Sequence, residues 1–576
     1  MEGNDLNRRN FLKGLGAAGA IAWLVSGRAA AGDVLDGYSN PVSFVDPLSY
    51  EQDFQIDPAL DPGPVFSLGV GSGDPRPHGI VLWTRVAPAA MADPAAPGAV
   101  AFEIAGDPEF RPGDIVIRGR ATLAGASDYT VKLPLQHKKL EPLRTYYYRF
   151  IYNRCASRTG RFKTLPDAGA SLDRVKFAFL SCQDYSNGYY TALAHLAKEG
   201  ADFVVFLGDY IYETVADPSF QNAQVRPVPP LPSGGSAAAG LEDYRHLYRV
   251  YKSDPNLQAV HERFTFIQLW DDHEFANDGY QDYHPDNNPD PAAPAPELRQ
   301  AANQAWVEYG LADVPFDPAA SPLESLKIYR SFRFGTLMEL VATDERLYRD
   351  GPPCGGDTES RYLASRCAEA ESASRTMLGA TQRDWFLDTV RNSTATWKIW
   401  ANEVTAMQMK VGPAYVTLDQ WDGYPAERAH LLSGIGLYGV KNFIAITGDI
   451  HSFIAGYLKP DYDDASAPVG VELVVGSVSS ANLVELAQSQ VPLPSAPLPV
   501  PIPTPPGVGV ESLLMASNPH MKFFNSSTHG YCLMDVGQNG VTCTMKAVTT
   551  IRQPQAGLYT LKTFRIGKDS VELVAV

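Results

Sequence analysis

Four short polar motifs, each directly after an apolar run, constrain this chain more than any other feature. The runs cover residues 175–180, 203–207, 264–269 and 443–447, and each has the length of a buried strand. The motifs that follow them are Ser181-Cys182-Gln183, Gly208-Asp209-Tyr210-Ile211-Tyr212, Trp270-Asp271-Asp272-His273-Glu274 and Gly448-Asp449-Ile450-His451. Because the carboxyl ends of strands in α/β proteins meet at one edge of a sheet, the sequence predicts that these side chains gather into one site.

The donor atoms in these motifs indicate two kinds of metal ligand. The thiolate of Cys182 and the phenolate of Tyr212 are anionic donors that favour trivalent iron over Mg²⁺ or Ca²⁺. His451 lies two residues after Asp449, so an extended segment would present both on the same side, where His451 can complete an iron site. The sequence therefore predicts one site rich in soft or anionic donors.

The carboxylates indicate a second, harder cation. Asp272 and Asp449 suit Ca²⁺, Mn²⁺ or Mg²⁺. Gly208 permits a sharp turn that would project Asp209 into the cleft, where its carboxylate can bridge two cations. Two neighbouring cations can hold the oxygens of a phosphate and activate a water for in-line attack. The motifs together predict a metal-dependent hydrolase, and the chain has no Gly-x-Ser-x-Gly motif for a serine nucleophile.

The order of the motifs carries a resemblance. Residues 208–212 match the Gly-Asp-x-x-Tyr motif of purple acid phosphatases. Residues 270–274 and 448–451 are similar to the third and last motifs of calcineurin-like metallophosphoesterases, with Asp272 in place of Asn and Asp449 in place of His. Cys182 stands where the first aspartate of that family would be. The combination is similar to the PhoD-like alkaline phosphatase family over nearly the whole mature chain.

The resemblance implies Fe³⁺ together with one or two Ca²⁺, with Mn²⁺, Mg²⁺ or Zn²⁺ as the alternatives. It implies iron ligands at Cys182, Asp209, Tyr212 and His451, with Asp209 as the bridge and with Asp272 and Asp449 on the calcium side. His273 would protonate the leaving oxygen or stabilise the transition state. Asn277 would contact calcium or the phosphate.

Hydrophobic patterning indicates two folded parts. Short alternating runs between residues 62 and 166 predict a small all-β domain of fibronectin or immunoglobulin type, with Trp83 in its core. Residues 70–74 lack the lysine and the helix of a phosphate-binding loop, and we interpret them as a turn. Residues 173–576 alternate between strand and helix patterns. They are expected to form an α/β catalytic domain, a layered β-sandwich metallophosphoesterase core flanked by helices.

Several segments outside the strand ends carry narrower expectations. Helices are predicted over residues 189–199, 241–252, 297–310 and 381–392, and strands over 397–404, 531–536, 542–547 and 560–576. Residues 221–240 and 491–507 are rich in proline and small residues, and they are expected to form loops or flaps. His529 either reaches the cleft or belongs to the turn before a strand, and we favour the turn.

Six cysteines in 576 residues are too few to form the framework of the fold. Cys354 and Cys367 lie in one polar loop, and a disulfide between them is predicted. Cys532 and Cys543 could pair across neighbouring strands. Cys182 stands apart from these because it ends a buried strand beside Gln183.

The first 31 residues indicate export. Arg8-Arg9 and the following Phe11-Leu12-Lys13 precede a short apolar stretch and Ala29-Ala30-Ala31, a pattern that resembles a twin-arginine signal peptide. The stretch is too short for a transmembrane segment. We therefore expect the twin-arginine translocation machinery to be a partner during export, and the protein to be periplasmic or secreted in a bacterium.

The net charge of −17 argues against a nucleic-acid partner. The main hypothesis is an exported enzyme that hydrolyses phosphomonoesters and phosphodiesters by attack of a metal-activated hydroxide, for phosphate scavenging. The first alternative is a phospholipase D-like phosphodiesterase that acts on phospholipid head groups, with apolar residues between 491 and 510 near the cleft. An alternative of another class is a non-catalytic secreted binding protein with a structural metal.

Overall fold

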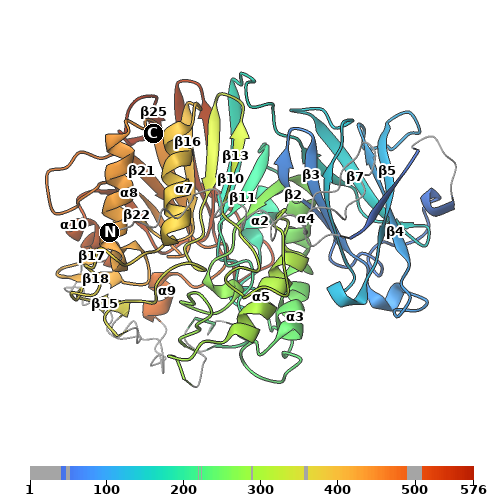
Figure 1. Ribbon diagram of the computed structural model, residues 1–576, viewed down its shortest axis with the longest axis horizontal. Helices are drawn as coiled ribbons and strands as arrows, with labels where there is room; N and C mark the ends of the chain where they lie inside the picture. Colours follow the sequence, from blue (N-terminus) through green and yellow to red (C-terminus); the bar gives the residue numbers. More distant parts are fainter. Residues whose placement is uncertain are drawn as a thin grey trace, which may run out of the picture.

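Two large β-sheets packed face to face, with helices on both outer faces, form the centre of the molecule (Figure 1). The computed structural model describes residues 40–46, 52–217, 220–221, 224–286, 290–355, 361–488 and 509–576. The expected signal peptide at residues 1–31 and the expected flap at residues 491–507 lie outside the described residues.

The first large sheet has ten strands in the order β26-β25-β24-β23-β10-β11-β12-β2-β3-β6. Its central strands β10, β11, β12 and β2 run parallel, and β23 joins β10 antiparallel. The strands are β2 (Val70–Arg76), β3 (Gly79–Arg85), β6 (Thr130–Gln136), β10 (Arg174–Leu180), β11 (Phe203–Phe206), β12 (Thr265–Gln268), β23 (Gly530–Gly537), β24 (Gly540–Val548), β25 (Leu558–Gly567) and β26 (Val574–Ala575).

The second large sheet has seven strands in the order β13-β14-β16-β19-β21-β20-β22, of which β14, β16, β19 and β21 are parallel. Apolar side chains from both sheets, such as Phe179, Ile267, Ile399 and Ile446, form one buried cluster between them. The strands are β13 (Arg330–Phe334), β14 (Met338–Ala342), β16 (Trp397–Asn402), β19 (Phe443–Thr447), β20 (Phe453–Leu458), β21 (Gly470–Val474) and β22 (Met521–Asn525).

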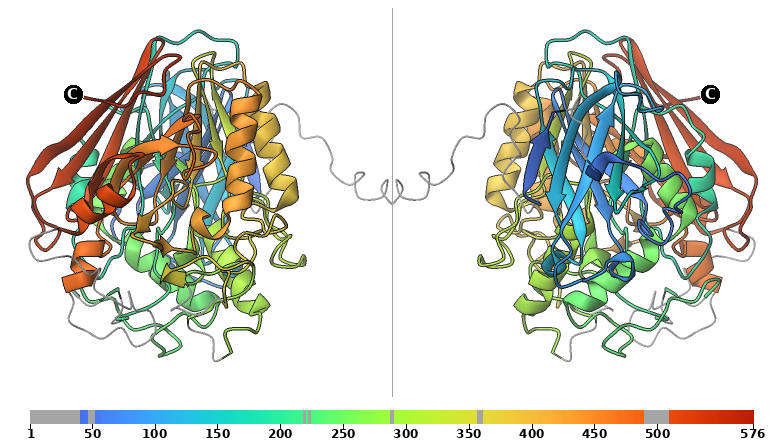
Figure 2. Two further views of the ribbon diagram at one scale, coloured as in Figure 1. Left: turned by 90° about the vertical axis from the view of Figure 1, so that its left-hand side faces the viewer. Right: turned by 90° about the vertical axis from the view of Figure 1, so that its right-hand side faces the viewer.

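Helices cover the two outer faces of this sandwich, as the side views in Figure 2 show. The ten-stranded sheet carries α2 (Thr191–Leu196), α3 (Leu241–Lys252), α4 (Pro255–Arg263) and α5 (Pro296–Tyr309). The seven-stranded sheet carries α7 (Gly379–Asn392) and α8 (Pro425–Leu437), with the short helices α9 (Leu483–Gln488) and α10 (Val510–Ser517) nearby. Single 3-10 turns occur at Gln52–Phe54, Pro88–Ala90, Gly125–Ser127, Asp272–Glu274 and Trp421–Gly423. The four predicted helices all form, whereas α4, α8, α9 and α10 were not predicted.

A separate six-stranded sheet lies at the amino-terminal end of the molecule. It packs against β2, β3 and β6, so one half of the amino-terminal sandwich is also part of the central ten-stranded sheet. The six strands are β1 (Val42–Val45), β4 (Ala99–Ala105), β5 (Ile115–Thr122), β7 (Thr145–Tyr152), β8 (Cys155–Ala156) and β9 (Gly160–Lys163).

Two expectations for the amino-terminal part are wrong. Residues 70–74 belong to β2, which pairs with β12 and β3 and is not a turn. Its glycines misled the interpretation, yet they are needed: a Cβ on Gly73 would lie 1.9 Å from the carbonyl oxygen of Leu311. Trp83 is buried, but its ring faces the helices, where its indole N–H donates to the carbonyl oxygen of Glu308 at 2.8 Å. It is therefore not in the core of the amino-terminal sandwich.

A three-stranded sheet of β15 (Tyr362–Ala364), β17 (Lys410–Val411) and β18 (Ala414–Thr417) completes the fold. The loop before β15 is closed by the disulfide between Cys354 and Cys367, which confirms that prediction. Cys532 and Cys543 are buried free thiols, and in the β23–β24 register each lies opposite a methionine of the neighbouring strand. The pairing considered for them is wrong.

Candidate metal centre

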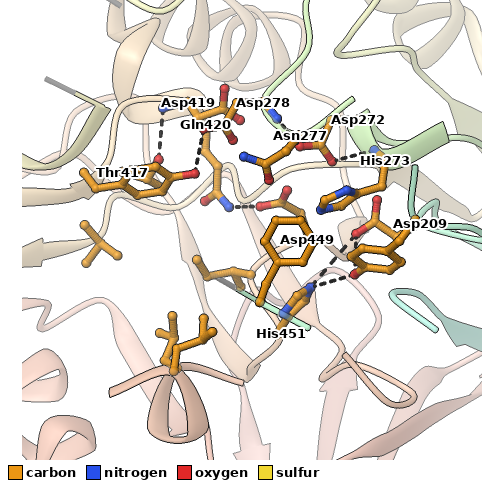
Figure 3. Close-up of a pocket in the computed structure, with 17 residues that line it drawn as sticks. Asp209, Asp272, His273, Asn277, Asp278, Thr417, Asp419, Gln420, Asp449 and His451 are labelled. Atoms are coloured by element: carbon orange, nitrogen blue, oxygen red, sulfur yellow. Dashed lines mark hydrogen bonds and ion pairs between the residues drawn. The ribbon is translucent and has the colours of Figure 1, made fainter. Parts of the chain in front are cut away.

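The four strand-end motifs converge on one cleft. Strands β10, β11 and β12 of the ten-stranded sheet and β19 of the seven-stranded sheet all end there. Figure 3 shows Asp209, His273, Asp449 and His451 pointing toward one another from these different segments. The structure therefore brings together residues that are up to 269 positions apart in the chain, since Cys182 groups with His451.

The first group of ligand atoms comes from Cys182, Asp209 and His451, which lie within 4.8 Å of one another. The Tyr212 hydroxyl donates to Oδ2 of Asp209 at 3.0 Å and lies 3.2 Å from Nε2 of His451. Nδ1 of His451 donates to the carbonyl oxygen of Ala481 at 2.6 Å, which leaves Nε2 directed at the group. This bond orients the ring, as a hydrogen bond from the other ring nitrogen does in metal-binding histidines. All four residues predicted to bind iron are therefore together.

The backbone at these positions is strained. Positive φ angles, which are uncommon outside glycine, occur at Cys182 (58°), Asp209 (57°), Asp449 (64°) and His451 (53°). Gly208 has φ of 105°, and a Cβ there would lie 2.4 Å from the Cβ of Asp271, so the expected sharp turn does require glycine. Strained residues of this kind cluster at functional sites, where the surrounding fold holds them.

Two more ligand groups adjoin the first. One comprises Asp209, Asp272 and His273, and the other comprises Asp271, Asp272 and Asp449. Asp209 belongs to two groups, as expected of a bridging ligand. Oδ1 of Asp209 and Oδ2 of Asp271 are buried and have no hydrogen-bond partner among the described residues. A buried carboxylate oxygen without a partner is costly, so these oxygens fit cations bound between the groups.

The pKa shifts of the candidate ligands also fit bound cations. Burial raises the pKa of the Cys182 thiol well above its usual value, and the nearby Asp209 raises it further. Burial also opposes ionisation of Asp209, but His273 and His451 outweigh it and lower the pKa of that carboxyl group to about 2. Burial raises the pKa of Asp449 to about 6. Cys182 would bind metal as a thiolate, so a cation must supply the charge that the protein does not.

His273 is held by a carboxylate that the sequence did not single out. Oε2 of Glu213 lies 2.7 Å from Nδ1 of His273, and both side chains are buried. Burial would lower the pKa of His273, but Glu213, Asp209 and Asp272 together raise it well above its usual value. Because Nδ1 contacts Glu213, Nε2 is the ring nitrogen that can interact with a ligand in the cleft. Glu213 ends the stretch Gly208-Asp209-Tyr210-Ile211-Tyr212-Glu213, so its position beside the motif was a usable signal.

Glu274 joins two of the motif loops. Its carboxylate accepts the backbone N–H of Asp209 at 3.0 Å, of Tyr210 at 2.6 Å and of Asp271 at 2.7 Å. Three such bonds fix the position of the β11 loop against the β12 loop. Glu274 therefore acts on the geometry of the ligands and does not line the cleft.

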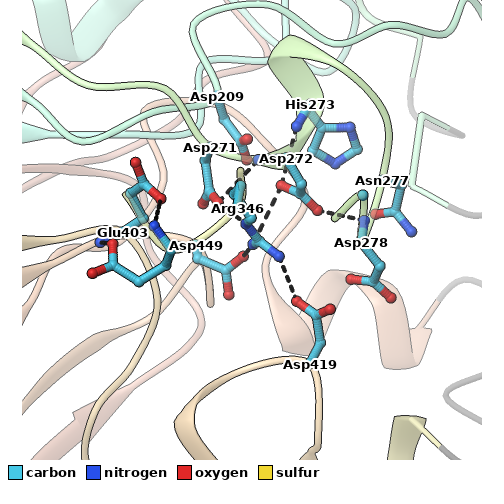
Figure 4. A network of polar contacts seen from close by, with 12 residues as sticks. Asp209, Asp271, Asp272, His273, Asn277, Asp278, Arg346, Glu403, Asp419 and Asp449 are labelled. Atoms are coloured by element: carbon cyan, nitrogen blue, oxygen red, sulfur yellow. Dashed lines mark hydrogen bonds and ion pairs between the residues drawn. The ribbon is translucent and has the colours of Figure 1, made fainter. Parts of the chain in front are cut away.

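An arginine lies among the carboxylates, and the sequence analysis missed it (Figure 4). The fully buried guanidinium of Arg346 contacts Asp271 at 2.5 Å, Asp419 at 2.6 Å, Asp449 at 2.9 Å and Asp272 at 3.5 Å. Arg346 follows strand β14 just as the four motifs follow theirs, so the same strand-end rule would have found it. Asp419 lies in the loop after β18 and carries no comparable signal.

Asn277 and His529 have different positions. Asn277 lines the cleft, and its backbone N–H donates to Oε1 of Glu213 at 2.9 Å. His529 does not line the cleft. It directly precedes β23, and its Nδ1 lies 3.0 Å from the hydroxyl of Ser477 while its Nε2 lies 3.2 Å from Glu485. The preferred interpretation of His529 as part of a turn before a strand is confirmed.

Comparison with known proteins identifies the class of protein that carries this site. The sequence model of the PhoD-like phosphatase family matches residues 177–545, and that of the PhoD-like phosphatase N-terminal domain matches residues 55–166. The fold and the site define a phosphoric ester hydrolase. The chain belongs to the PhoD-like phosphatase family, which confirms the resemblance found in the motifs.

Individual relatives agree with this assignment. Alkaline phosphatase D of Bacillus subtilis (strain 168) is 31% identical over 592 aligned positions, which cover 99% of this chain and 89% of the relative. A solved structure described as "Structure of PhoD" superposes with a TM-score of 0.76 at 30% identity and covers 90% of this chain and 93% of that one. The prediction of an enzyme is confirmed over the alternative of a non-catalytic binding protein. Within the described residues, no helix has the length and apolar character needed to cross a bilayer.

Proposed function

We propose that this protein is an exported, metal-dependent hydrolase that cleaves phosphomonoesters and phosphodiesters. The observation that carries the proposal is the pair of ligand groups that share Asp209, with one group containing Cys182 and His451 and the other containing Asp272. Two adjacent cation sites at the carboxyl edge of the sheets suit a phosphate better than any other common substrate group.

The proposed ligand assignment follows the donor types. Fe³⁺ would be held by Cys182, Asp209, Tyr212 and His451, and one or two Ca²⁺ by Asp209, Asp272 and Asp449. When bound, the cations would supply positive charge for the phosphate oxygens and lower the pKa of a water that attacks phosphorus. Mn²⁺, Mg²⁺ or Zn²⁺ are the alternatives that a metal analysis distinguishes.

His273 and Asn277 would act directly on the substrate. The raised pKa of His273 keeps its ring protonated near neutral pH, so Nε2 can donate a proton to the leaving oxygen. Glu213 orients the ring through Nδ1 and stabilises its positive charge. Asn277, at the rim of the cleft, would contact calcium or a phosphate oxygen.

Export and phosphate scavenging form a separate part of the proposal. They are supported by the sequence of residues 1–31, with the paired Arg8-Arg9 and the Ala-rich end of that segment. Export through the twin-arginine route would deliver the chain folded, to the periplasm or beyond it. Replacement of Arg8 and Arg9 by lysine should retain the protein inside the cell, and cell fractionation would test this.

Elemental analysis of the purified holoenzyme tests the metal assignment. About one iron per chain with calcium is expected, and chelation should abolish phosphate release from 4-nitrophenyl phosphate until both metals are restored. Zinc or manganese in place of iron would overturn the roles given to Cys182 and Tyr212. Full activity in metal-free, folded protein would overturn the proposed mechanism.

A phospholipase D-like action on lipid head groups is the second candidate. It is favoured by apolar side chains in the cleft wall, among them Ile450 and Leu483. Most of the segment expected to supply apolar flap residues, 491–510, lies outside the described residues. Release of choline from phosphatidylcholine vesicles at a rate comparable with that of a small diester would support it, and a large preference for the small diester would contradict it.

A further inference from the structure

The cleft has two chemically different walls. The ligand groups and His273 make up one part of its lining, and the other part includes Val416 on β18, Ile450 after β19, and Leu483 and Leu486 on α9. We propose that these four side chains form a subsite for an uncharged, apolar organic group of the phosphoester. The inference rests on the proposed function, since the phosphate itself would lie on the metal side.

Three of these four side chains, which together we call the apolar wall, belong to or pack against a buried cluster. Val416 and Leu483 are members of the apolar core around the seven-stranded sheet, and Ile450 packs against it. Ile450 lies between Asp449 and His451, so the wall begins directly beside the ligand groups. An organic group attached to a bound phosphate would therefore lie next to this wall.

Polar contacts behind α9 hold the wall in place. Oδ1 of Asn482 accepts the backbone N–H of Val484 at 3.1 Å and of Glu485 at 3.0 Å, as an N-terminal helix cap does. Glu485 pairs with Nε2 of His529 at 3.2 Å. The backbone N–H of Leu483 donates to the Ser526 hydroxyl at 3.1 Å. These bonds leave the leucines on the cleft side of a helix that is anchored elsewhere.

Charge narrows the class of substrate further. Among the described residues that line the cleft there is no lysine or arginine. The guanidinium groups that contact these lining carboxylates are buried: Arg346 and Arg349 pair with Asp419, and Arg361 pairs with Asp278. Away from His273, a second anionic group on the substrate would meet the buried carboxylates of Asp278 and Asp419, whose arginine partners do not line the cleft. The cleft therefore favours a single phosphate with an apolar substituent over polyphosphates.

The expected effect is measurable with a homologous series. Each methylene that leaves water for an apolar site improves binding by about fourfold. In n-alkyl phosphates from methyl to hexyl, the leaving alcohols hardly differ in reactivity, so a change in kcat/KM reports contact with the wall. We expect kcat/KM to rise by about fourfold per carbon over the first few carbons and pyrophosphate to be a poor substrate.

The experiment uses the metal-loaded enzyme and two readouts. Phosphate release is measured for the alkyl phosphates, and inhibition constants are measured for the n-alkylphosphonates of the same lengths. The variant Leu486→Ser should flatten both series, whereas Leu437→Ser, at a side chain on the outer surface that is 85% exposed, should leave both slopes unchanged.

The outcomes separate the subsite from the proposed function. A flat series with active wild-type enzyme would overturn the subsite and leave the phosphoesterase standing. Failure to hydrolyse any ester would contradict the proposed function, and the phosphonate series, measured by thermal stabilisation, would then decide the subsite alone. Preference for pyrophosphate over hexyl phosphate would also overturn the inference.

Discussion

The two halves of the metal centre differ in how the protein itself balances charge. The thiolate group, which we define as Cys182, Tyr212 and His451, has no lysine or arginine contact in the described part of the chain. The carboxylate group, defined as Asp271, Asp272 and Asp449, surrounds the permanent cation of Arg346. Asp209 lies between them and belongs to ligand sets on both sides.

This difference predicts different dependence on metal. In the thiolate group burial disfavours the anionic form of Cys182, and the protein offers it the hydroxyl of Ser181 but no lysine or arginine. In the carboxylate group Arg346 already compensates part of the negative charge, so the group can persist without its metal. We therefore expect the ion at the thiolate group, the first ion, to be bound tightly. The ion at the carboxylate group, the second ion, should exchange more readily.

Loss of the shared ligand should have the largest effect. Asp209→Asn removes the bridging charge from both ligand sets, so phosphate release should fall by about a thousandfold and both metals should be depleted. Asp384→Asn, at an exposed side chain, is the matched control. Elemental analysis and kinetics on the same samples would measure this, and a variant that retains either full activity or both metals would break the comparison.

Removal of the internal cation tests the carboxylate group alone. Arg346→Gln leaves buried carboxylates without their partner, so the free energy of unfolding should drop by about 3–5 kcal/mol. The loss should be smaller at high Ca²⁺, because a cation can replace the missing charge. Urea unfolding with and without Ca²⁺ is the measurement. Arg144→Gln, at an exposed ion pair with Glu141, should change stability by less than about 1 kcal/mol.

A pair of ligand variants separates the two halves. Cys182→Ser should lower the affinity for the first ion by at least about tenfold and spare the second, because a serine hydroxyl is a much weaker anionic donor. Asp449→Asn should do the reverse. Metal titration followed by elemental analysis would show this, and equal loss of both metals in both variants would mean that the halves are a single unit.

The smallest expected effect concerns pH. Since Glu213 is the strongest factor that raises the pKa of His273, Glu213→Gln should lower that pKa. A proton donor works only while protonated, so the rate falls as pH rises through its pKa, and in the variant this alkaline limb should move to lower pH. A pH–rate profile measures it. Glu371→Gln, at an exposed side chain, should leave the limb in place.

The sequence was most informative where a short apolar run ends in a polar residue. That rule located Cys182, Asp209 and Asp449 because the side chains after parallel strands must share an edge. The same rule would also have located Arg346, which follows β14, but the sequence analysis did not apply it there. Asp419 could not be found this way, because it reaches the cleft through the packing of the small β15–β18–β17 sheet, which no local pattern encodes.

Glycines explain the main error in the fold. Gly71 and Gly73 look like turn residues in sequence, yet the strand they form passes so close to Leu311 that a side chain would collide with it. Close approach between distant segments is a tertiary property and leaves no periodic signal. The same limitation applies to Trp83, whose burial was predictable but whose partner layer was not.

The shared ten-stranded sheet has a consequence for the integrity of the chain. Strand β12 pairs with β2 from the amino-terminal part, so a fragment without that part would leave β12 with a row of unpaired backbone N–H and C=O groups. An open parallel edge of this kind recruits other chains, and such a fragment should aggregate. By pairing with β12, the amino-terminal residues cover this edge and prevent the catalytic half from associating with other copies.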